Sequence, residues 1–203
     1  MGLYRRLILP RLLHLVMRSR ELTPYRVQLI PQAGGQVLEL GIGSGLNLPF
    51  YTAQVTRLYG LDPSLALLRL ARRQAARASV PVLLLHGLAE ALPLADASLD
   101  TVVSTWTLCT ITGIEAALAE ARRVLRPQGQ LLFVEHGLAP QPRVAAWQRR
   151  LTPWWQPLAG GCHLDRPIAA LLEAAGWRLA ELHTTYLRGP RPWTYTYWGR
   201  AVP

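Results

Sequence analysis

Gln36-Val-Leu-Glu-Leu-Gly-Ile-Gly-Ser-Gly45 is the stretch of sequence that decides the fold. Residues 36–40 are mostly apolar and predict a short buried strand. The three glycines that follow let the backbone turn tightly and approach a ligand closely. A dinucleotide fingerprint has the spacing G-x-G-x-x-G, but Leu46 stands where its last glycine would be. The loop therefore predicts a nucleotide-type ligand and does not favour a diphosphate.

Asp62 follows a second predicted strand, at residues 55–61. A carboxylate at this place in a doubly wound fold accepts hydrogen bonds from ribose hydroxyls. The alternative is that Asp62 caps a helix that begins at Pro63. Both interpretations can hold together, because one carboxylate oxygen can cap the helix while the other binds a ligand.

Strand and helix patterns alternate along the middle of the chain, which predicts a parallel sheet covered by helices on both faces. The fold class is therefore α/β, with a Rossmann-like, mostly parallel, doubly wound sheet. Two further strands near the end of the chain predict an antiparallel C-terminal edge strand. The expected elements are strands at 80–85, 100–104, 131–135, 177–186 and 193–201, and helices from 62 onward and over 114–125.

The chain divides into an N-terminal helical arm or lid at 1–33 and a main domain at 34–203, in which 138–176 covers the substrate. With 203 residues, half of them hydrophobic, it is long enough for one domain and too apolar to be disordered. No segment reaches the roughly 18 apolar residues of a membrane span. Its two cysteines cannot form a disulfide framework, so we expect a cytoplasmic protein.

The formal net charge is +10, and all 22 basic residues are arginines. A basic surface can favour nucleic acid, anionic lipid or an acidic substrate. We expect no nucleic acid, because the sequence shows no recognised RNA-binding module. Apolar residues at helical spacing in the arm, surrounded by arginines that include Arg5 and Arg6, leave peripheral membrane contact open beside packing as a lid.

The chain resembles the class I S-adenosylmethionine-dependent methyltransferases of the type 11 group. The resemblance covers about a hundred residues in the middle of the chain, with its motifs in the expected order. These motifs are Val37-Leu-Glu-Leu-Gly-Ile-Gly-Ser-Gly45, Gly60-Leu-Asp-Pro63, Ala89-Glu-Ala-Leu-Pro93 with Asp96 to Asp100, and Arg123-Val-Leu-Arg-Pro-Gln-Gly129.

The resemblance implies S-adenosyl-L-methionine as cofactor and S-adenosyl-L-homocysteine as product. It places the methionine part against the glycine loop, the ribose on Asp62, the adenine near Leu88 and the sulfonium near Trp106. Many relatives carry Asp where this chain has Leu88, so the adenine amine needs another acceptor. The cofactor residues so implied are Glu39, Gly41, Gly43, Ser44, Gly45, Asn47, Asp62, Pro63, Leu88, Ala89, Glu90, Thr105 and Trp106.

A narrower resemblance links the chain to methyltransferase-like subfamily 7, whose animal members are membrane-associated alkyl thiol S-methyltransferases. The chain differs from them at its start, where it has a short Arg-rich arm in place of a longer hydrophobic anchor. The matching pieces are Gly45-x-Asn47-x-x-Phe50-Tyr51, Leu108-Cys109, Glu135-His136, Trp147-Gln148 and Gly161-Cys162-x-Leu164-x-Arg166.

His136 is the first candidate for the catalytic base, because it follows a strand at the carboxyl end of the sheet, where ligands bind. An imidazole exchanges protons near neutral pH. Glu135 could orient it, and His163 is the second candidate. The alternative is that His136 is simply bonded to the backbone. No local pair of ligands predicts a metal, and Cys109 and Cys162 are expected to pack as small apolar residues.

These observations predict methyl transfer to a small, fairly hydrophobic acceptor, most of all a thiol. The alternatives are N-methylation of a phospholipid amine, C-methylation of a quinone, and a non-enzymatic RNA-binding or cofactor-binding protein. Trp147, Trp154 and Trp155 could make an aromatic pocket for the acceptor or a small core of their own. The sequence does not give the oligomeric state.

Overall fold

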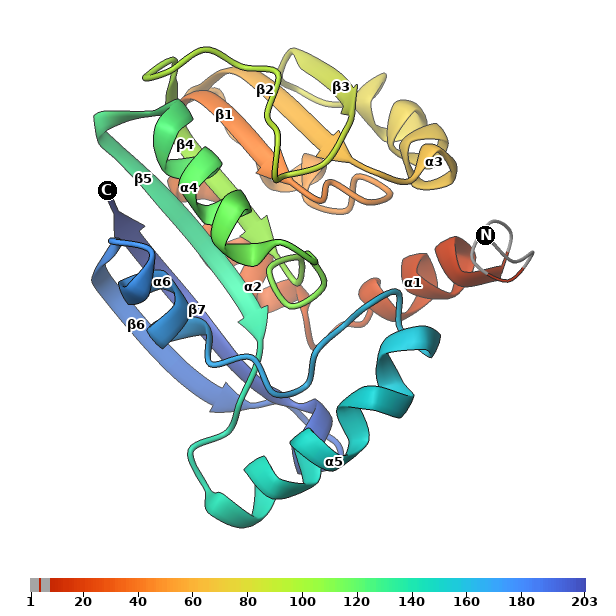
Figure 1. Ribbon diagram of the computed structural model, residues 1–203. Coiled ribbons are helices and arrows are strands. Elements are labelled where there is room, and N and C mark those ends of the chain that lie inside the picture. The colour runs from red at the N-terminus through yellow and green to blue at the C-terminus, as the bar shows by residue number, and fades with distance from the viewer. Residues whose placement is uncertain (1–3, 5–7) are drawn as a thin grey trace.

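A seven-stranded sheet forms the centre of the protein (Figure 1), whose computed structural model describes residue 4 and residues 8–203. Its strand order is β3-β2-β1-β4-β5-β7-β6. The first five strands of the chain run parallel, and β7 runs antiparallel to both of its neighbours. Their bounds are β1 Gly35–Leu40, β2 Val55–Asp62, β3 Val82–His86, β4 Leu99–Thr105, β5 Leu125–His136, β6 Arg178–Tyr186 and β7 Tyr195–Val202. The predicted α/β doubly wound fold is thus confirmed.

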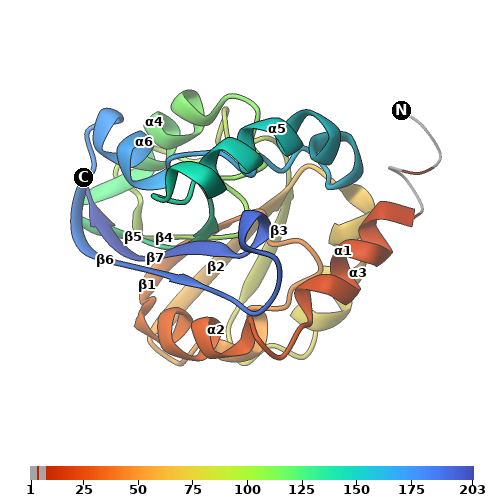
Figure 2. The same ribbon diagram turned by 90° about the horizontal axis from the view of Figure 1, so that it is seen from below.

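Helices cover both faces of the sheet (Figure 2). On one face lie α4 (Ile114–Val124), α5 (Pro142–Leu158) and α6 (Ile168–Ala174), and on the other lie α2 (Thr23–Leu29) and α3 (Leu65–Ala75). Helix α1 (Leu9–Met17) precedes α2 on that side of the molecule. Short 3-10 helices occupy Ile30–Gln32, Leu48–Phe50 and Arg191–Trp193.

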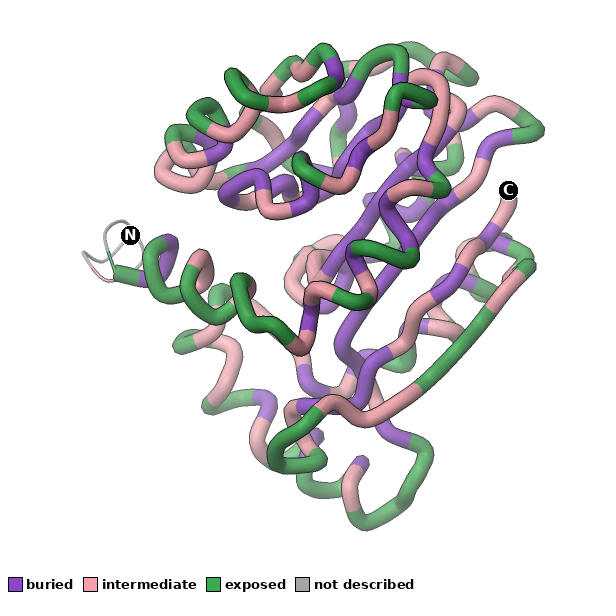
Figure 3. The backbone as a smooth tube through the Cα atoms, turned by 180° about the vertical axis from the view of Figure 1, so that it is seen from behind, coloured by how far each residue is buried: buried purple, intermediate pink, exposed green. Residues whose placement is uncertain are grey.

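The core consists of two apolar layers, one on each face of the sheet. The central strands between these layers are largely buried (Figure 3). Successive strand residues point to opposite faces, so Val37 and Leu38, next to each other in β1, belong to different layers. Both are fully buried. Val102 and Val103 of β4 are likewise adjacent, buried and divided between the two layers, as expected for central strands of a sheet that is covered on both faces.

The helix after β2 begins at Leu65 and not at Pro63, the start that goes with Asp62 as the helix cap. Ser64, not Asp62, is its N-cap, and the Ser64 hydroxyl accepts the N–H of Leu67 at 3.3 Å. The side chain of Asp62 instead accepts the backbone N–H of Ser64 at 2.7 Å. Asp62 therefore shapes the turn into α3 without capping the helix, and it lies beside the ligand-binding end of the sheet.

The N-terminal helix α1 projects from the body of the fold (Figure 1). Only Leu9 and Pro10 of this helix are buried. Arg5 and Arg6 of the predicted arm lie outside the described residues. Among residues 4 and 8–203, no helix has both the length and the apolar content needed to cross a membrane.

Candidate active site

A cavity of about 480 Å³ opens at the carboxyl ends of β1, β2 and β4. This edge of a doubly wound sheet is where such folds bind ligands, and the volume is typical of a small-molecule site. Of the residues that the sequence assigns to the cofactor, all but Gly45 line it. The cavity wall also includes residues of α1, together with Thr110, Ile111, Thr112, Ala159 and Gly160.

The glycine loop follows β1 in a conformation that few other residues adopt. Gly41, Gly43 and Gly45 have φ angles of +66°, +56° and +81°, in the left-handed region that favours glycine. A Cβ atom on Gly41 would collide with the side chain of Thr107. The bare backbone of this loop thus provides a cradle against the cavity.

Asp62 connects this loop to the end of β2. Its Oδ2 accepts the N–H of Gly43 at 2.9 Å, and its Oδ1 accepts the N–H of Ser64. Burial raises the pKa of Asp62, while these two backbone hydrogen bonds oppose the shift. Each carboxylate oxygen has a second lone pair, so Asp62 can still accept the two hydroxyls of a ribose.

Glu39, at the end of β1, lies at the centre of a buried polar network. Its Oε1 accepts the Asn47 side-chain amide at 2.7 Å, and its Oε2 accepts the Tyr51 hydroxyl at 2.9 Å. The same Asn47 amide also donates to the hydroxyl of Thr105 at 2.9 Å. Burial raises the pKa of Glu39 to about 8 against the opposing hydrogen bonds. A cationic group in the cavity would favour the carboxylate form of Glu39.

Arg26 of α2 completes this network from the opposite side. Its Nε donates to the Asn47 carbonyl oxygen at 2.9 Å. Its guanidinium lies 5.0 Å from the ring centroid of Trp106, a cation–π arrangement. Trp106 itself has a φ of 51°, a strained conformation for a bulky residue and one that clusters at functional sites. This strained residue lines the cavity.

Glu135, near the end of β5, holds the loop after β4 in place through hydrogen bonds to its backbone. This fully buried carboxylate accepts the N–H groups of Thr107 and Cys109 at 3.0 and 3.3 Å, and the Ser104 hydroxyl at 2.7 Å. Burial raises its pKa to about 7. The idea that Glu135 orients His136 finds no hydrogen bond in the structure; its partners are this loop and Ser104.

The two predicted catalytic histidines lie outside the wall of the main cavity. His136 is buried, with Nε2 3.4 Å from the Pro192 carbonyl oxygen and Nδ1 3.9 Å from the Cys162 sulfur. His163 lines a second cavity of about 290 Å³ and contacts the side chain of Gln156. Neither lies among the residues that hold Asp62 and the glycine loop, so their catalytic roles stay predictions.

A different histidine faces the glycine loop. His14 of α1 lies with Nδ1 2.7 Å from the Ser44 hydroxyl, and it lines the main cavity. Sequence reasoning missed His14, Arg26 and Tyr51. A motif signal existed for Tyr51 alone, in Asn47-x-x-Phe50-Tyr51.

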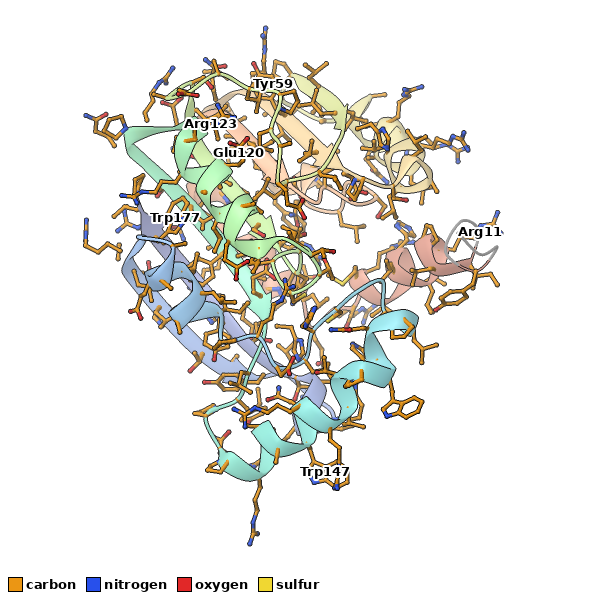
Figure 4. The ribbon with its side chains drawn as sticks, in the orientation of Figure 1. Arg11, Tyr59, Glu120, Arg123, Trp147 and Trp177 are labelled. Carbon is orange, nitrogen blue, oxygen red and sulfur yellow. The ribbon has the colours of Figure 1, made fainter. Side chains whose placement is uncertain are left out.

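The aromatic pocket proposed for the tryptophans is not formed. The Trp147 side chain projects outward from α5 (Figure 4), and Trp147 and Trp154 are 55% and 78% exposed. Trp155 packs instead against Trp193, with ring centroids 5.9 Å apart. The apolar wall of the cavity comes in part from α1, through Leu9, Leu13 and Met17.

The fold and the site together define a class I methyltransferase. A Rossmann-like sheet with β7 antiparallel beside β5, a glycine cradle after β1 and an acid after β2 fit the methionine and ribose parts of S-adenosylmethionine. Residues 38–133 match the family described as "Methyltransferase domain". The chain belongs to the S-adenosylmethionine-dependent methyltransferases, and S-adenosyl-L-methionine is the cofactor of this family.

Relatives of known activity agree with this assignment. The chain is 33% identical over 162 residues to thiol S-methyltransferase TMT1B of Rattus norvegicus, covering 77% of this chain and 65% of that protein. It is 32% identical over 182 residues to the Homo sapiens TMT1B, covering 87% and 73%. It is also 33% identical over 137 residues to a phosphatidylethanolamine N-methyltransferase of Cereibacter sphaeroides, covering 66% of each. The matched part thus spans about two thirds of each relative's length.

Solved structures share the fold at lower identity. An S-adenosylmethionine-dependent methyltransferase from Thermotoga maritima superposes with a TM-score of 0.67 at 22% identity, covering 98% of this chain and 97% of that one. Another from Aquifex aeolicus gives 0.63 at 17% identity, covering 94% and 97%.

Proposed function

We propose that the protein transfers a methyl group from S-adenosylmethionine to the sulfur of a small, fairly hydrophobic thiol. The observation that carries the proposal is the composition of the main cavity. One side of it holds the glycine loop, Glu39 and Asp62, and another side is apolar, with Leu9, Leu13 and Met17 from α1. A polar cofactor end and an apolar acceptor end thus share one space.

The size of the cavity favours a small acceptor over a two-chain lipid. The cavity must hold the cofactor as well as the acceptor. Its volume of about 480 Å³ lies in the lower part of the range for ligand sites. The relatives that are named thiol S-methyltransferases support a thiol. The relative that is named a phosphatidylethanolamine N-methyltransferase makes a lipid amine the competing acceptor.

Bound S-adenosylmethionine supplies a methyl group on a positively charged sulfur. Asp62 would hold the ribose hydroxyls, and the backbone of the glycine loop would hold the methionine part. Glu39, which accepts a hydrogen bond from the Asn47 side-chain amide, would supply negative charge in the wall of the cavity near the cofactor's sulfonium. The residues of α1 would cover the cavity and exclude water, so that the acceptor sulfur is aligned with the methyl group.

His14 is the base that the geometry favours for the thiol. Among the described residues it is the one histidine in the cavity wall. When Nδ1–H donates to the Ser44 hydroxyl, which lies 2.7 Å away, Nε2 carries no hydrogen and can accept the proton of the acceptor thiol. Nε2 of His14 would take the proton of the acceptor thiol, and the resulting thiolate would be the nucleophile toward the methyl group that bound S-adenosylmethionine supplies. Thiolate, not thiol, is the reactive form.

The experiment has two arms. Calorimetry with S-adenosylmethionine and S-adenosylhomocysteine measures cofactor binding, and a methyl-transfer screen compares alkyl thiols with lipid amines and quinols. We expect binding of both cofactor forms and transfer to alkyl thiols. Turnover on amines or quinols alone would overturn the thiol but keep the methyltransferase, and folded protein that bound neither cofactor form would overturn the site.

We also infer that the outer face of α1 contacts an anionic lipid surface. Ile8, Leu12, Leu15 and Val16 of this face are between 45% and 65% exposed. Exposed arginines flank them, among them Arg11, whose side chain extends from α1 (Figure 4). An exposed apolar stripe bordered by arginines is the composition of a helix that lies in a membrane interface.

Co-sedimentation with phosphatidylglycerol vesicles tests this contact, with phosphatidylcholine vesicles as the neutral comparison. Leu15→Asp should abolish sedimentation. Val27→Asp is the matched control, because Val27 is 55% exposed on α2 and should leave binding unchanged. Equal sedimentation of both variants with the wild type would contradict the contact.

A further inference from the structure

The two cysteines of the chain lie together beside the active site. Cys109 is in the loop between β4 and α4, and Cys162 is in the loop between α5 and α6. Although they are 53 residues apart in sequence, their sulfur atoms are 3.8 Å apart. The N–H of His163 donates to the Cys109 carbonyl oxygen at 2.8 Å, which holds the two loops against each other.

The Arg166 guanidinium strengthens this loop contact. It is buried and donates to the carbonyl oxygens of Leu108 and Ile111, on either side of Cys109. The approach of the two sulfurs therefore rests on backbone contacts made by both loops. A pair held in this way meets far more often than two thiols on mobile segments.

The surroundings of Cys162 favour its thiolate. The hydrogen bond with Cys109 lowers the pKa of Cys162, and His136 and Trp155 lower it further, while burial opposes them. His136 Nδ1 is 3.9 Å from the sulfur. The indole N–H of Trp155 is buried without a hydrogen-bond partner among the described residues, so a thiolate would satisfy it. The same hydrogen bond and burial raise the pKa of Cys109.

The two thiols also differ in access. Cys162 is partly exposed, whereas Cys109 is buried. A reagent from solution would therefore meet Cys162 first. A reactive, accessible thiolate with a second thiol behind it is the arrangement of a redox-active cysteine pair.

We propose that Cys109 and Cys162 form a reversible disulfide by exchange with low-molecular-weight disulfides. The Cys162 thiolate attacks one sulfur of the disulfide and releases the other as a thiolate, which leaves a mixed disulfide on Cys162. Cys109 then loses its proton and attacks the Cys162 sulfur, which releases the second thiolate. The protein loses two electrons and two protons, and the small disulfide is reduced to two thiols.

The bond would join two parts of the cavity wall. Thr110 and Ile111 follow Cys109, Ala159 and Gly160 precede Cys162, and all four line the main cavity. A disulfide needs its sulfurs about 2.05 Å apart, so the loops must shift slightly toward each other. The glycine loop and Asp62 lie on other elements, so oxidation should act on the acceptor side of the cavity and spare cofactor binding.

The test uses the purified chain in oxidised and reduced glutathione buffers of graded ratio, followed by acid quench, thiol alkylation and intact mass. The chain has only two cysteines, so the result has one interpretation. We expect each chain to lose both free thiols without gaining the mass of a bound glutathione. Dithiothreitol should restore both thiols. Amide hydrogen exchange in the 108–112 and 159–163 loops should slow by about tenfold or more in the oxidised protein.

Single variants separate the two steps. Cys109→Ser should stop at a glutathione adduct on Cys162, whereas Cys162→Ser should leave Cys109 unreacted in the folded protein. In the Cys109→Ser background, His136→Gln should slow alkylation of Cys162 at neutral pH by about fivefold or more. A wild-type chain that accumulates a glutathione adduct without closing, that only dimerises, or whose thiols react only after unfolding would overturn the proposal. None of these readouts depends on the methyl acceptor.

Discussion

Gly43 donates its backbone N–H to Oδ2 of Asp62 at 2.9 Å, across the carboxyl ends of neighbouring strands β1 and β2. One carboxylate thereby fixes the glycine loop and remains available to a ligand. The loop that would hold the methionine part of the cofactor and the acid that would hold its ribose thus form one unit. A change at Asp62 should affect both.

Asp62→Ala should weaken the binding of S-adenosylhomocysteine by about 1.5–3 kcal/mol, the range for a hydrogen bond to a charged group. Asp62→Asn should weaken this binding by less, because the amide oxygen of Asn can still accept one of the two backbone N–H groups. Calorimetry measures both affinities. Asp96→Ala is the control, because the exposed Asp96 pairs with Arg123 away from the cavity. Unchanged affinity in Asp62→Ala would remove Asp62 from the site.

Gly41→Ala should destabilise the fold by about 2 kcal/mol or more, because the new Cβ is strained at positive φ and collides with Thr107. Adding Thr107→Ala to Gly41→Ala should recover the part of the stability that the collision costs, because it removes the two side-chain atoms nearest to the new Cβ. The part that the positive φ of residue 41 costs should remain. Gly34→Ala is the control, because the nearest atom to its Cβ would be 3.6 Å away. Denaturant unfolding gives the three free energies, and equal stability of Gly41→Ala and Gly34→Ala would contradict the cradle geometry.

The cofactor half of the site could be predicted from sequence because it is local. The glycine loop and Asp62 each follow directly from a strand, and parallel strands bring their carboxyl ends to one edge. The acceptor half could not be predicted in this way. His14 reaches the loop only because α1 folds across it, and a helical stripe of apolar residues does not say which face meets the body.

The cysteine pair and the order of the last strands also depend on contacts between distant segments, so the sequence did not predict them. Cys109 and Cys162 meet through a contact between two loops, for which spacing along the chain carries no signal. The sequence predicts the two antiparallel strands β6 and β7, but only the pairing of β7 with β5 places β7 inside the sheet and β6 at its edge.

The buried carboxyls should make the protein less stable as the pH rises. Burial raises the pKa of Glu135 from 4.5 to about 7. Between these two values the folded state holds a proton that the unfolded state has lost, so the free energy of unfolding falls by up to about 1.4 kcal/mol per pH unit for this group. Glu39, with a pKa of about 8, should extend the fall to higher pH.

Glu135→Gln should therefore flatten the dependence of unfolding free energy on pH between about pH 5 and 7, measured by urea unfolding across this range. Glu120→Gln is the control, because its hydrogen bond with Arg123 lowers the pKa of Glu120, which confines its effect to lower pH. A slope that Glu135→Gln leaves as steep as in the wild type would show that Glu135 is ionised in the folded protein throughout this range.

His14→Ala and His136→Ala distinguish the base that the geometry favours from the one that the sequence predicts. His14 Nδ1 lies on Ser44 in the cavity wall, whereas His136 lies behind Cys162. We expect His14→Ala to lower kcat for an alkyl thiol by about 100-fold at neutral pH. The loss should shrink at higher pH, where the free thiol ionises by itself, while S-adenosylhomocysteine affinity changes little. His136→Ala should keep most of its turnover, and the reverse ranking of the two variants would return the role of base to His136.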